Sequence, residues 1–215
     1  MQNTAAVWWT AGAAAAGLVL GAVASGLTRR FLGRERNLAG SWWFGAVQTG
    51  AVLGLLGWRI GARGELAVYG LVAVAAVPLV VIDWCEHRLP RALVWPQLVS
   101  TLAGFAVLCL TRHDPTPGLR ALAALSAATG LFLVLAVVTA GGIGAGDVNA
   151  AAVIGLVTGW YSWTHVAGAL LTASVLALVL IAVPAAHRQD DKGATVVPFG
   201  PCLLTGALIM VLAGG

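Results

Sequence analysis

The sequence predicts an all-α protein, a polytopic membrane bundle of about eight transmembrane helices. The first observation is composition: hydrophobic residues make up 60% of the 215-residue chain and charged residues only 9%. A water-soluble domain of this size needs far more charge to cover its surface. The second observation is that long apolar segments follow one another with only short polar connections. Soluble enzyme classes are therefore excluded.

The apolar segments, each expected to form one helix, lie at about residues 6–27, 42–60, 65–84, 92–110, 120–140, 148–161, 164–185 and 198–214. No positive charge precedes the first segment, which favours a retained span over a cleaved signal peptide. The sixth segment is short, and the Trp160 and Tyr161 at its end suit a membrane interface. We divide the chain into two N-terminal helices with a short basic loop, residues 1–64, and a six-helix core, residues 65–215. A high content of Gly, Ala, Ser and Thr favours close helix contacts.

The loop charges predict the orientation. The loops that follow segments one, three and seven hold eight of the 12 basic residues, namely Arg29, Arg30, Arg34, Arg36, Arg88, Arg91, Arg188 and Lys192. The opposite side holds the other four, Arg59, Arg63, Arg112 and Arg120. The positive-inside rule therefore places the first group in the cytoplasm and both termini outside. These small clusters form no basic stripe interleaved with aromatics, so we expect the lipid bilayer as a partner and no nucleic acid.

Two acidic residues lie at the expected cytoplasmic face. Asp83 ends the apolar run Val80-Val81-Ile82, and Asp147 opens the sixth segment after the glycine-rich string Gly141-Gly142-Ile143-Gly144-Ala145-Gly146. The whole chain has only eight acidic residues, and a carboxylate at membrane depth is costly enough to suggest function. Glycines let a loop adopt unusual backbone angles and let another backbone approach closely.

Two carboxylates brought together cannot both ionise cheaply, so one keeps its proton at neutral pH. That shared proton is the working state of an aspartyl protease, in which one group activates water and the other protonates the carbonyl oxygen. An alternative is a small proton- or cation-coupled transporter that uses both acids as a relay near the bilayer midplane. Simpler interpretations also stay open: Asp147 as a helix N-cap, and Asp83 as an interfacial acid paired with Arg88 or Arg91.

A metal site is a weaker alternative. On a helix, Asp83, Glu86 and His87 would share one face and could hold a metal together with Asp147. Pro90 disfavours a helix just before it, and no second histidine lies nearby. We therefore expect no metal and no cofactor.

The three cysteines, Cys85, Cys109 and Cys202, form no C-x-x-C pair and are interpreted as small core residues.

Three motifs in this order resemble the type IV prepilin peptidase family over about residues 65–214. Gly144-Ala145-Gly146-Asp147 resembles its G-x-G-D signature. Ile82-Asp83 followed by Arg88-Leu89-Pro90 resembles its first catalytic Asp with the downstream basic element. Pro198-Phe199-Gly200-Pro201 resembles the P-F-G-P element that opens its last span.

The resemblance implies an intramembrane aspartic endopeptidase of the bacterial inner membrane. It would cleave prepilin or pseudopilin precursors after a short basic leader, at the cytoplasmic face. Asp83 and Asp147 would be the catalytic pair, Gly144 and Gly146 would shape the loop, and residues 198–201 would support the site.

The chain departs from the family pattern at two places. Many members carry Lys two positions after the second Asp, where this chain has Asn149. Larger members have a cysteine-containing N-terminal methyltransferase region, whereas the first loop here, about Thr28 to Ser41, is short and has no cysteine. The resemblance therefore implies a short form that cleaves without methylating.

Overall fold

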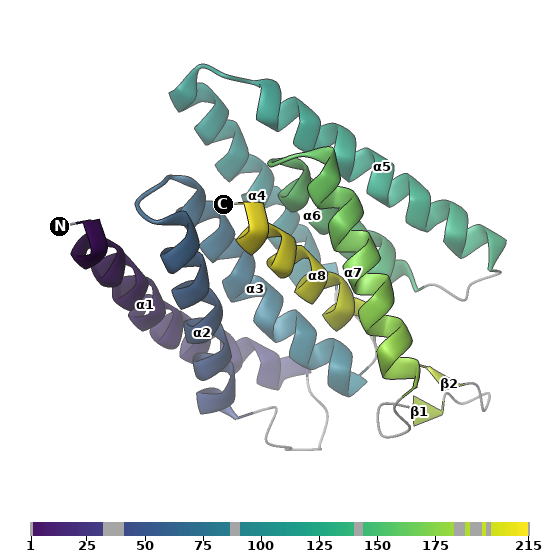
Figure 1. Ribbon diagram of the computed structural model, residues 1–215. Helices are drawn as coiled ribbons and strands as arrows, with labels where there is room; N and C mark the ends of the chain where they lie inside the picture. The colour runs from purple at the N-terminus through teal and green to yellow at the C-terminus, as the bar shows by residue number, and fades with distance from the viewer. Residues whose placement is uncertain are drawn as a thin grey trace. The chain divides into compact units, whose positions relative to one another are not determined.

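The computed structural model describes residues 2–31, 41–86, 91–139, 144–182, 188–189, 195–196 and 199–214. Within these ranges the chain forms eight helices and one short pair of strands (Figure 1). The elements are α1 (Gln2–Phe31), α2 (Trp42–Ile60), α3 (Glu65–Glu86), α4 (Arg91–Arg112), α5 (Thr116–Val138), α6 (Ala145–Gly159), α7 (Trp163–Ile181), β1 (Arg188–Gln189), β2 (Thr195–Val196) and α8 (Phe199–Gly214). The predicted all-α bundle is confirmed, with one helix for each predicted apolar segment.

The strands are the one element type that the sequence did not predict. β1 and β2 pair antiparallel, with Arg188 opposite Val196 and Gln189 opposite Thr195. With two residues each, they lie between α7 and α8 in the sequence and leave the fold class unchanged.

Within the described part of the chain, the helices long and apolar enough to cross a membrane are α1, α3, α4, α5 and α7. Helices α6 and α8 are apolar but shorter. Large apolar side chains on the outer faces of the long helices are exposed, among them Val23, Leu110, Val137 and Leu171. An apolar surface of this extent is stable against lipid and not against water. The chain is therefore a multi-pass membrane protein.

The chain forms two compact units. The first comprises residues 1–86 and 90–118, with residue 215, and the second comprises residues 87–89 and 119–214. The first unit thus holds α1 to α4 and the start of α5, and the second holds the rest of α5 and α6 to α8. The division into residues 1–64 and 65–215 stays a prediction.

In the first unit, α1 and α2 pack antiparallel through small residues. A Cβ added to Gly17 would lie 2.7 Å from the carbonyl oxygen of Thr49 and 2.8 Å from Cα of Gly50. Near the ends of the pair, Gly57 contacts Trp9 and Ala13, and the hydroxyl of Ser25 donates to the carbonyl oxygen of Trp42 at 3.4 Å. The predicted close packing through small residues is confirmed here.

A tight turn connects α2 to α3. Gly61 adopts φ 67° with ψ −148°, a combination that only glycine reaches without strain, and its N–H donates to the carbonyl oxygen of Gly57 at 3.0 Å. Helix α3 then contacts α1, α2 and α4. In its most apolar stretch 61% of the residues are buried, against 17–22% in α1, α4, α5 and α7. Helix α3 is therefore the central helix of the first unit.

The second unit is built around α6. Its buried residues run from Ala150 through Gly159 without a break, and Val148 and Trp160 are buried as well. Helices α7 and α8 pack on it and on each other, and small residues of α5 contact Gly155 and Gly159. Because α6 is apolar all round, its sequence shows no single packing face, and these neighbours are what bury it.

Candidate functional site

Asp83 lies in the last turn of α3 and only 5% of its surface is exposed. The helix continues three residues past it to Glu86, whereas the sequence predicted an end near residue 84. Its neighbours Val81 and Ile82 are also buried, while Trp84 is 45% exposed. The side chain of Asp83 is thus held inside the protein, beside a tryptophan that faces outwards.

The tryptophans show how deep Asp83 lies. Because α1–α2 and α3–α4 are antiparallel pairs, one end of the first unit carries four exposed tryptophans, which are Trp42, Trp43, Trp84 and Trp95. The opposite end carries three others, Trp8, Trp9 and Trp58. Two tryptophan girdles at the two ends of a helical bundle mark the two membrane interfaces. Asp83 is therefore level with one interface and away from the bilayer midplane.

Asp147 lies in the first turn of α6 and is partly buried. Its backbone N–H and that of Val148 donate to the carbonyl oxygen of Gly144, at 3.0 and 3.4 Å. Gly144 is the N-cap residue and makes no side-chain cap, so the interpretation of Asp147 as the N-cap is wrong. Asp147 is instead the third helical residue, where an acidic side chain interacts favourably with the positive end of the helix dipole.

The predicted loop glycines have ordinary geometry where the structure describes them. Gly144 has φ −70° and ψ 149°, extended backbone that any residue adopts, and Gly146 lies within α6. A Cβ on Gly144 would lie 3.6 Å from Oδ2 of Asp147, an ordinary van der Waals contact. The expected unusual backbone angles are therefore wrong for Gly144. What the glycine provides is an open surface beside the Asp147 carboxylate.

The P-F-G-P element opens α8. Pro198 lies outside the described residues, Phe199 is the first residue of α8, and Gly200 and Pro201 are buried. The ring of Phe199 packs against Phe132 of α5 with centroids 6.0 Å apart. Phe199 thus holds the start of α8 against α5 within the second unit, and the supporting role of residues 198–201 stays a prediction.

Several sequence predictions fall outside the described residues. They concern His87 and the Arg88-Leu89-Pro90 element, and with them the pairing of Asp83 with Arg88. Among the residues that the structure describes, no three His, Cys, Asp or Glu side chains come together as a metal site. Asp83 belongs to the first unit, and Gly144, Gly146 and Asp147 to the second. The pairing of the two aspartates stays a prediction.

None of the three cysteines, all of which the structure describes, forms a disulfide bond. Cys202 is buried, as expected of a small core residue, whereas Cys85 and Cys109 are only partly buried.

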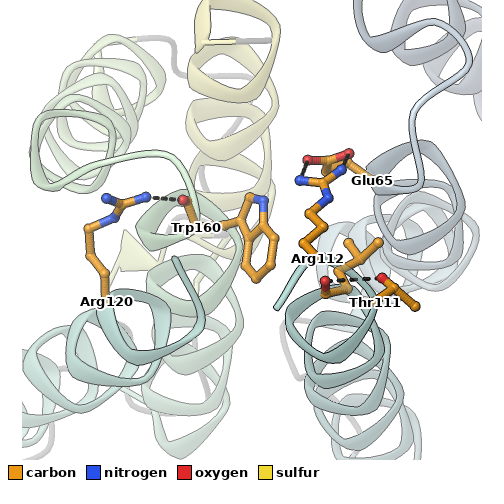
Figure 2. A network of polar contacts seen from close by, with 6 residues as sticks. Glu65, Thr111, Arg112, Arg120 and Trp160 are labelled. Atoms are coloured by element: carbon orange, nitrogen blue, oxygen red, sulfur yellow. Dashed lines mark hydrogen bonds and ion pairs between the residues drawn. The ribbon is translucent and has the colours of Figure 1, made fainter. Parts of the chain in front are cut away.

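Two arginines have structural roles that the sequence did not reveal (Figure 2). In the first unit, Arg112 at the end of α4 forms a two-pronged ion pair with Glu65 at the start of α3. In the second unit, Arg120 of α5 donates to backbone carbonyl oxygens at the end of α6. The sequence grouped both with the loop charges. Their partners lie 39 or more residues away along the chain, so no local pattern indicated them.

Comparison with known proteins gives two matches. The sequence model of the type IV leader peptidase family matches residues 70–183, just over half of the chain. A prepilin leader peptidase/N-methyltransferase of Pseudomonas putida is 30% identical over 161 residues, which are 74% of this chain and 54% of that protein. The chain thus spans about half the length of this curated relative. No solved structure matches the chain. The family match includes Asp83 and Asp147 and ends before the P-F-G-P element.

Proposed function

Because this chain belongs to the type IV leader peptidase family, we propose that it is an intramembrane aspartic endopeptidase with Asp83 and Asp147 as its catalytic pair. The observation that carries the proposal is that the family match encloses two carboxylates placed at the ends of buried helices. Only eight acidic residues occur in the chain, and a buried carboxylate in a membrane protein is costly unless it has a task.

The two aspartates support the chemistry of peptide hydrolysis. At working pH the pair shares one proton, because two nearby carboxylates do not both ionise. The ionised carboxylate takes a proton from water as the water attacks the scissile carbonyl carbon. The protonated carboxyl group donates its proton to the carbonyl oxygen, which gives a tetrahedral diol intermediate. The carboxyl group that took the proton from water then passes it to the leaving nitrogen as the carbon–nitrogen bond breaks, and the other carboxylate takes a proton back from the diol. No cofactor enters these steps.

The depth of Asp83 favours a substrate cut at a membrane interface. We propose prepilin or pseudopilin precursors as substrates, with a basic leader in the cytoplasm and an apolar helix in the bilayer. Eight basic residues lie in the loops on the predicted cytoplasmic side, which is where Asp83 and Asp147 are expected. A peptide that enters the membrane at that face presents its leader junction at the level of the Trp42, Trp43, Trp84 and Trp95 girdle.

Two departures from the family pattern refine the proposal. Asn149 is partly buried one turn into α6 and brings no charge toward Asp147. The catalytic pair is therefore proposed to work without a neighbouring lysine. The segment between α1 and α2 has no cysteine, which supports cleavage without N-methylation by this part of the chain.

The experiment is leader removal from a co-expressed prepilin, followed as a shift in gel mobility. Asp83→Asn and Asp147→Asn should each abolish cleavage, because Asn keeps the shape of the side chain and loses its acid–base function. Asp114→Asn is the matched control. Asp114 accepts a hydrogen bond from the N–H of Thr116 in the turn before α5, and the amide oxygen of Asn accepts it equally well. Normal cleavage in both catalytic variants would overturn the proposal.

A proton- or cation-coupled transporter is the alternative, and it predicts acids near the bilayer midplane. The position of Asp83 beside Trp84 argues against it. Reconstituted vesicles provide the test. Proton flux that is lost in Asp83→Asn, together with no leader cleavage by the wild type, would favour the transporter.

A further inference from the structure

Arg120 connects two helices of the second unit, α5 and α6. It lies in the first turns of α5, and its side chain reaches the opposite end of α6 from Asp147. Its Nε donates to the carbonyl oxygen of Gly159 at 2.8 Å, and Nη2 donates to the carbonyl oxygen of Trp160 (Figure 2). Both acceptors belong to the C-terminal end of α6, where helix carbonyls lack helical partners and the dipole is negative. The guanidinium group of Arg120 suits this end of the helix, because it is positively charged and its N–H groups can donate to two carbonyl oxygens at once.

Small residues continue this contact along the two helices. A Cβ on Gly155 would lie 2.5 Å from the carbonyl oxygen of Ala124, and one on Gly159 would lie 2.5 Å from Cβ of Ala124. Ala121, Ala124 and Ala128 are fully or almost fully buried. Because the two backbones lie this close, a small axial shift or rotation of α6 would change the whole contact with α5.

Asp147 occupies the other end of the same helix. Helix α6 has 15 residues, so it is about 22 Å long. It is buried from Ala150 to Gly159. Its N-terminal end is less restrained, since Gly144 and Ala145 are exposed and Gly144 makes no side-chain cap. The position of the Asp147 carboxylate therefore depends on how the helix is fixed at its C-terminal end and along its length.

We propose that Arg120 is a positioning residue for Asp147, because it fixes the axial position and rotation of α6 from the end opposite the carboxylate. This inference rests on the proposed function, in which Asp147 is one of the catalytic pair. A helix transmits a displacement at one end to the other because its backbone hydrogen bonds make it stiff on this length scale. A misplacement of about 1 Å in a catalytic group costs up to about a hundredfold in rate.

The test compares Arg120→Gln and Arg120→Lys with Arg63→Gln in detergent-purified full-length protein. Arg63 is an exposed arginine in the turn between α2 and α3 and serves as the matched control. For Arg120→Gln we expect kcat for prepilin cleavage to fall between about tenfold and a hundredfold, with KM changed by less than about twofold. Arg120→Lys should lose less activity, since lysine keeps the charge and lacks the fork that bridges two carbonyls. Arg63→Gln should match the wild type.

Hydrogen exchange measured by mass spectrometry gives a readout that does not depend on activity. In Arg120→Gln the peptide covering residues 158–162 should exchange faster because its local contacts are lost. The positioning role further predicts faster exchange in the peptide covering residues 144–148, where the N–H groups of Asp147 and Val148 bond to Gly144. Faster exchange at residues 158–162 alone would overturn the proposal and leave Arg120 as a local cap.

The outcomes separate this proposal from the proposed function. If Asp147→Asn abolishes cleavage and Arg120→Gln leaves kcat unchanged, the positioning role is wrong and the catalytic assignment stands. If Asp147→Asn cleaves normally, the catalytic assignment is wrong. The exchange of residues 144–148 then decides alone whether Arg120 fixes α6. Should Arg120→Gln fail to fold, Arg120→Lys answers both questions.

Discussion

The carboxylate of Glu65, at the start of α3, is held by both terminal nitrogens of Arg112, at the end of α4. The two N–O distances are 2.5 and 2.6 Å, one to each carboxylate oxygen. The side chain of Glu65 is 10% exposed and that of Arg112 is 44% exposed. The pair thus joins the two helices at the end of the first unit opposite Asp83, partly protected from solvent.

Replacing Glu65 by Gln should lower the free energy of unfolding by about 1–2 kcal/mol, between the values typical of exposed and buried pairs. The physical reason is that Arg112 loses a charged, two-pronged partner while staying partly desolvated. Unfolding in mixed micelles with increasing SDS measures the change. Arg63→Gln, which removes an exposed arginine from the neighbouring turn, should stay within about 0.5 kcal/mol of the wild type. A double-mutant cycle of Glu65→Gln and Arg112→Gln that gives no coupling would contradict the prediction.

Apolar runs and their interruptions were enough to predict the helices, and the errors have local causes. Helix α3 passes Asp83 and reaches Glu86, because no proline or glycine interrupts the chain at residues 84–86. Helix α7 ends at Ile181 instead of near residue 185, three residues before Pro184. The residue before a proline avoids helical angles, so the sequence already contained this signal.

The contacts between helices could not be predicted from the sequence, and the reason is physical. In a soluble protein an apolar stripe indicates the buried face, whereas in lipid both the buried and the exposed faces are apolar. Arg112 and Arg120 therefore looked alike, as loop-side charges. One binds a carboxylate of α3 and the other binds carbonyl oxygens of α6. Asp83 and Asp147 were indicated by their cost in a membrane, but the buried course of α6 behind Asp147 was not.

Gly17 and Gly12 of α1 allow a matched pair of substitutions to alanine. Gly17→Ala should destabilise the protein by about 1–3 kcal/mol, the usual cost of overpacking a close contact. The added Cβ would meet the backbone of α2 at Thr49 and Gly50, which cannot move aside as a flexible side chain does. Gly12 lies on the same helix with nothing within 4 Å of its added Cβ. Gly12→Ala should be neutral or stabilising by up to about 1 kcal/mol, since Ala favours helix. Equal effects of the two substitutions would show that α1 and α2 do not pack as described.

The contact between α5 and α6 allows a similar comparison. Gly155→Ala places a Cβ 2.5 Å from the carbonyl oxygen of Ala124 and should force the helices apart. We expect a loss of about 1–3 kcal/mol in the free energy of unfolding. Gly130, on α5, has nothing within 4 Å of its added Cβ, so Gly130→Ala should leave stability unchanged or slightly raised. Thermal unfolding in detergent measures both. A Gly155→Ala variant as stable as Gly130→Ala would contradict the tight α5–α6 contact.

Helix α7 begins at a side-chain cap made by Ser162, and a second serine within the helix provides its control. The hydroxyl of Ser162 accepts from the N–H of His165 at 3.3 Å and lies 2.6 Å from Nδ1 of the same residue. Ser162→Ala should cost about 1 kcal/mol, as loss of an N-cap usually does. Ser174 lies in the same helix, exposed, with its hydroxyl donating back to the carbonyl oxygen of Leu170 at 2.8 Å.

Because that bond in mid-helix only duplicates a backbone bond, Ser174→Ala should be neutral or slightly stabilising. The two variants make the same chemical change in one helix, so a difference in unfolding midpoint isolates the cap. Hydrogen exchange should also quicken at the first turn of α7 in Ser162→Ala and not in Ser174→Ala. If both variants unfold at the same SDS fraction and exchange alike, the contacts of Ser162 do not stabilise the start of α7.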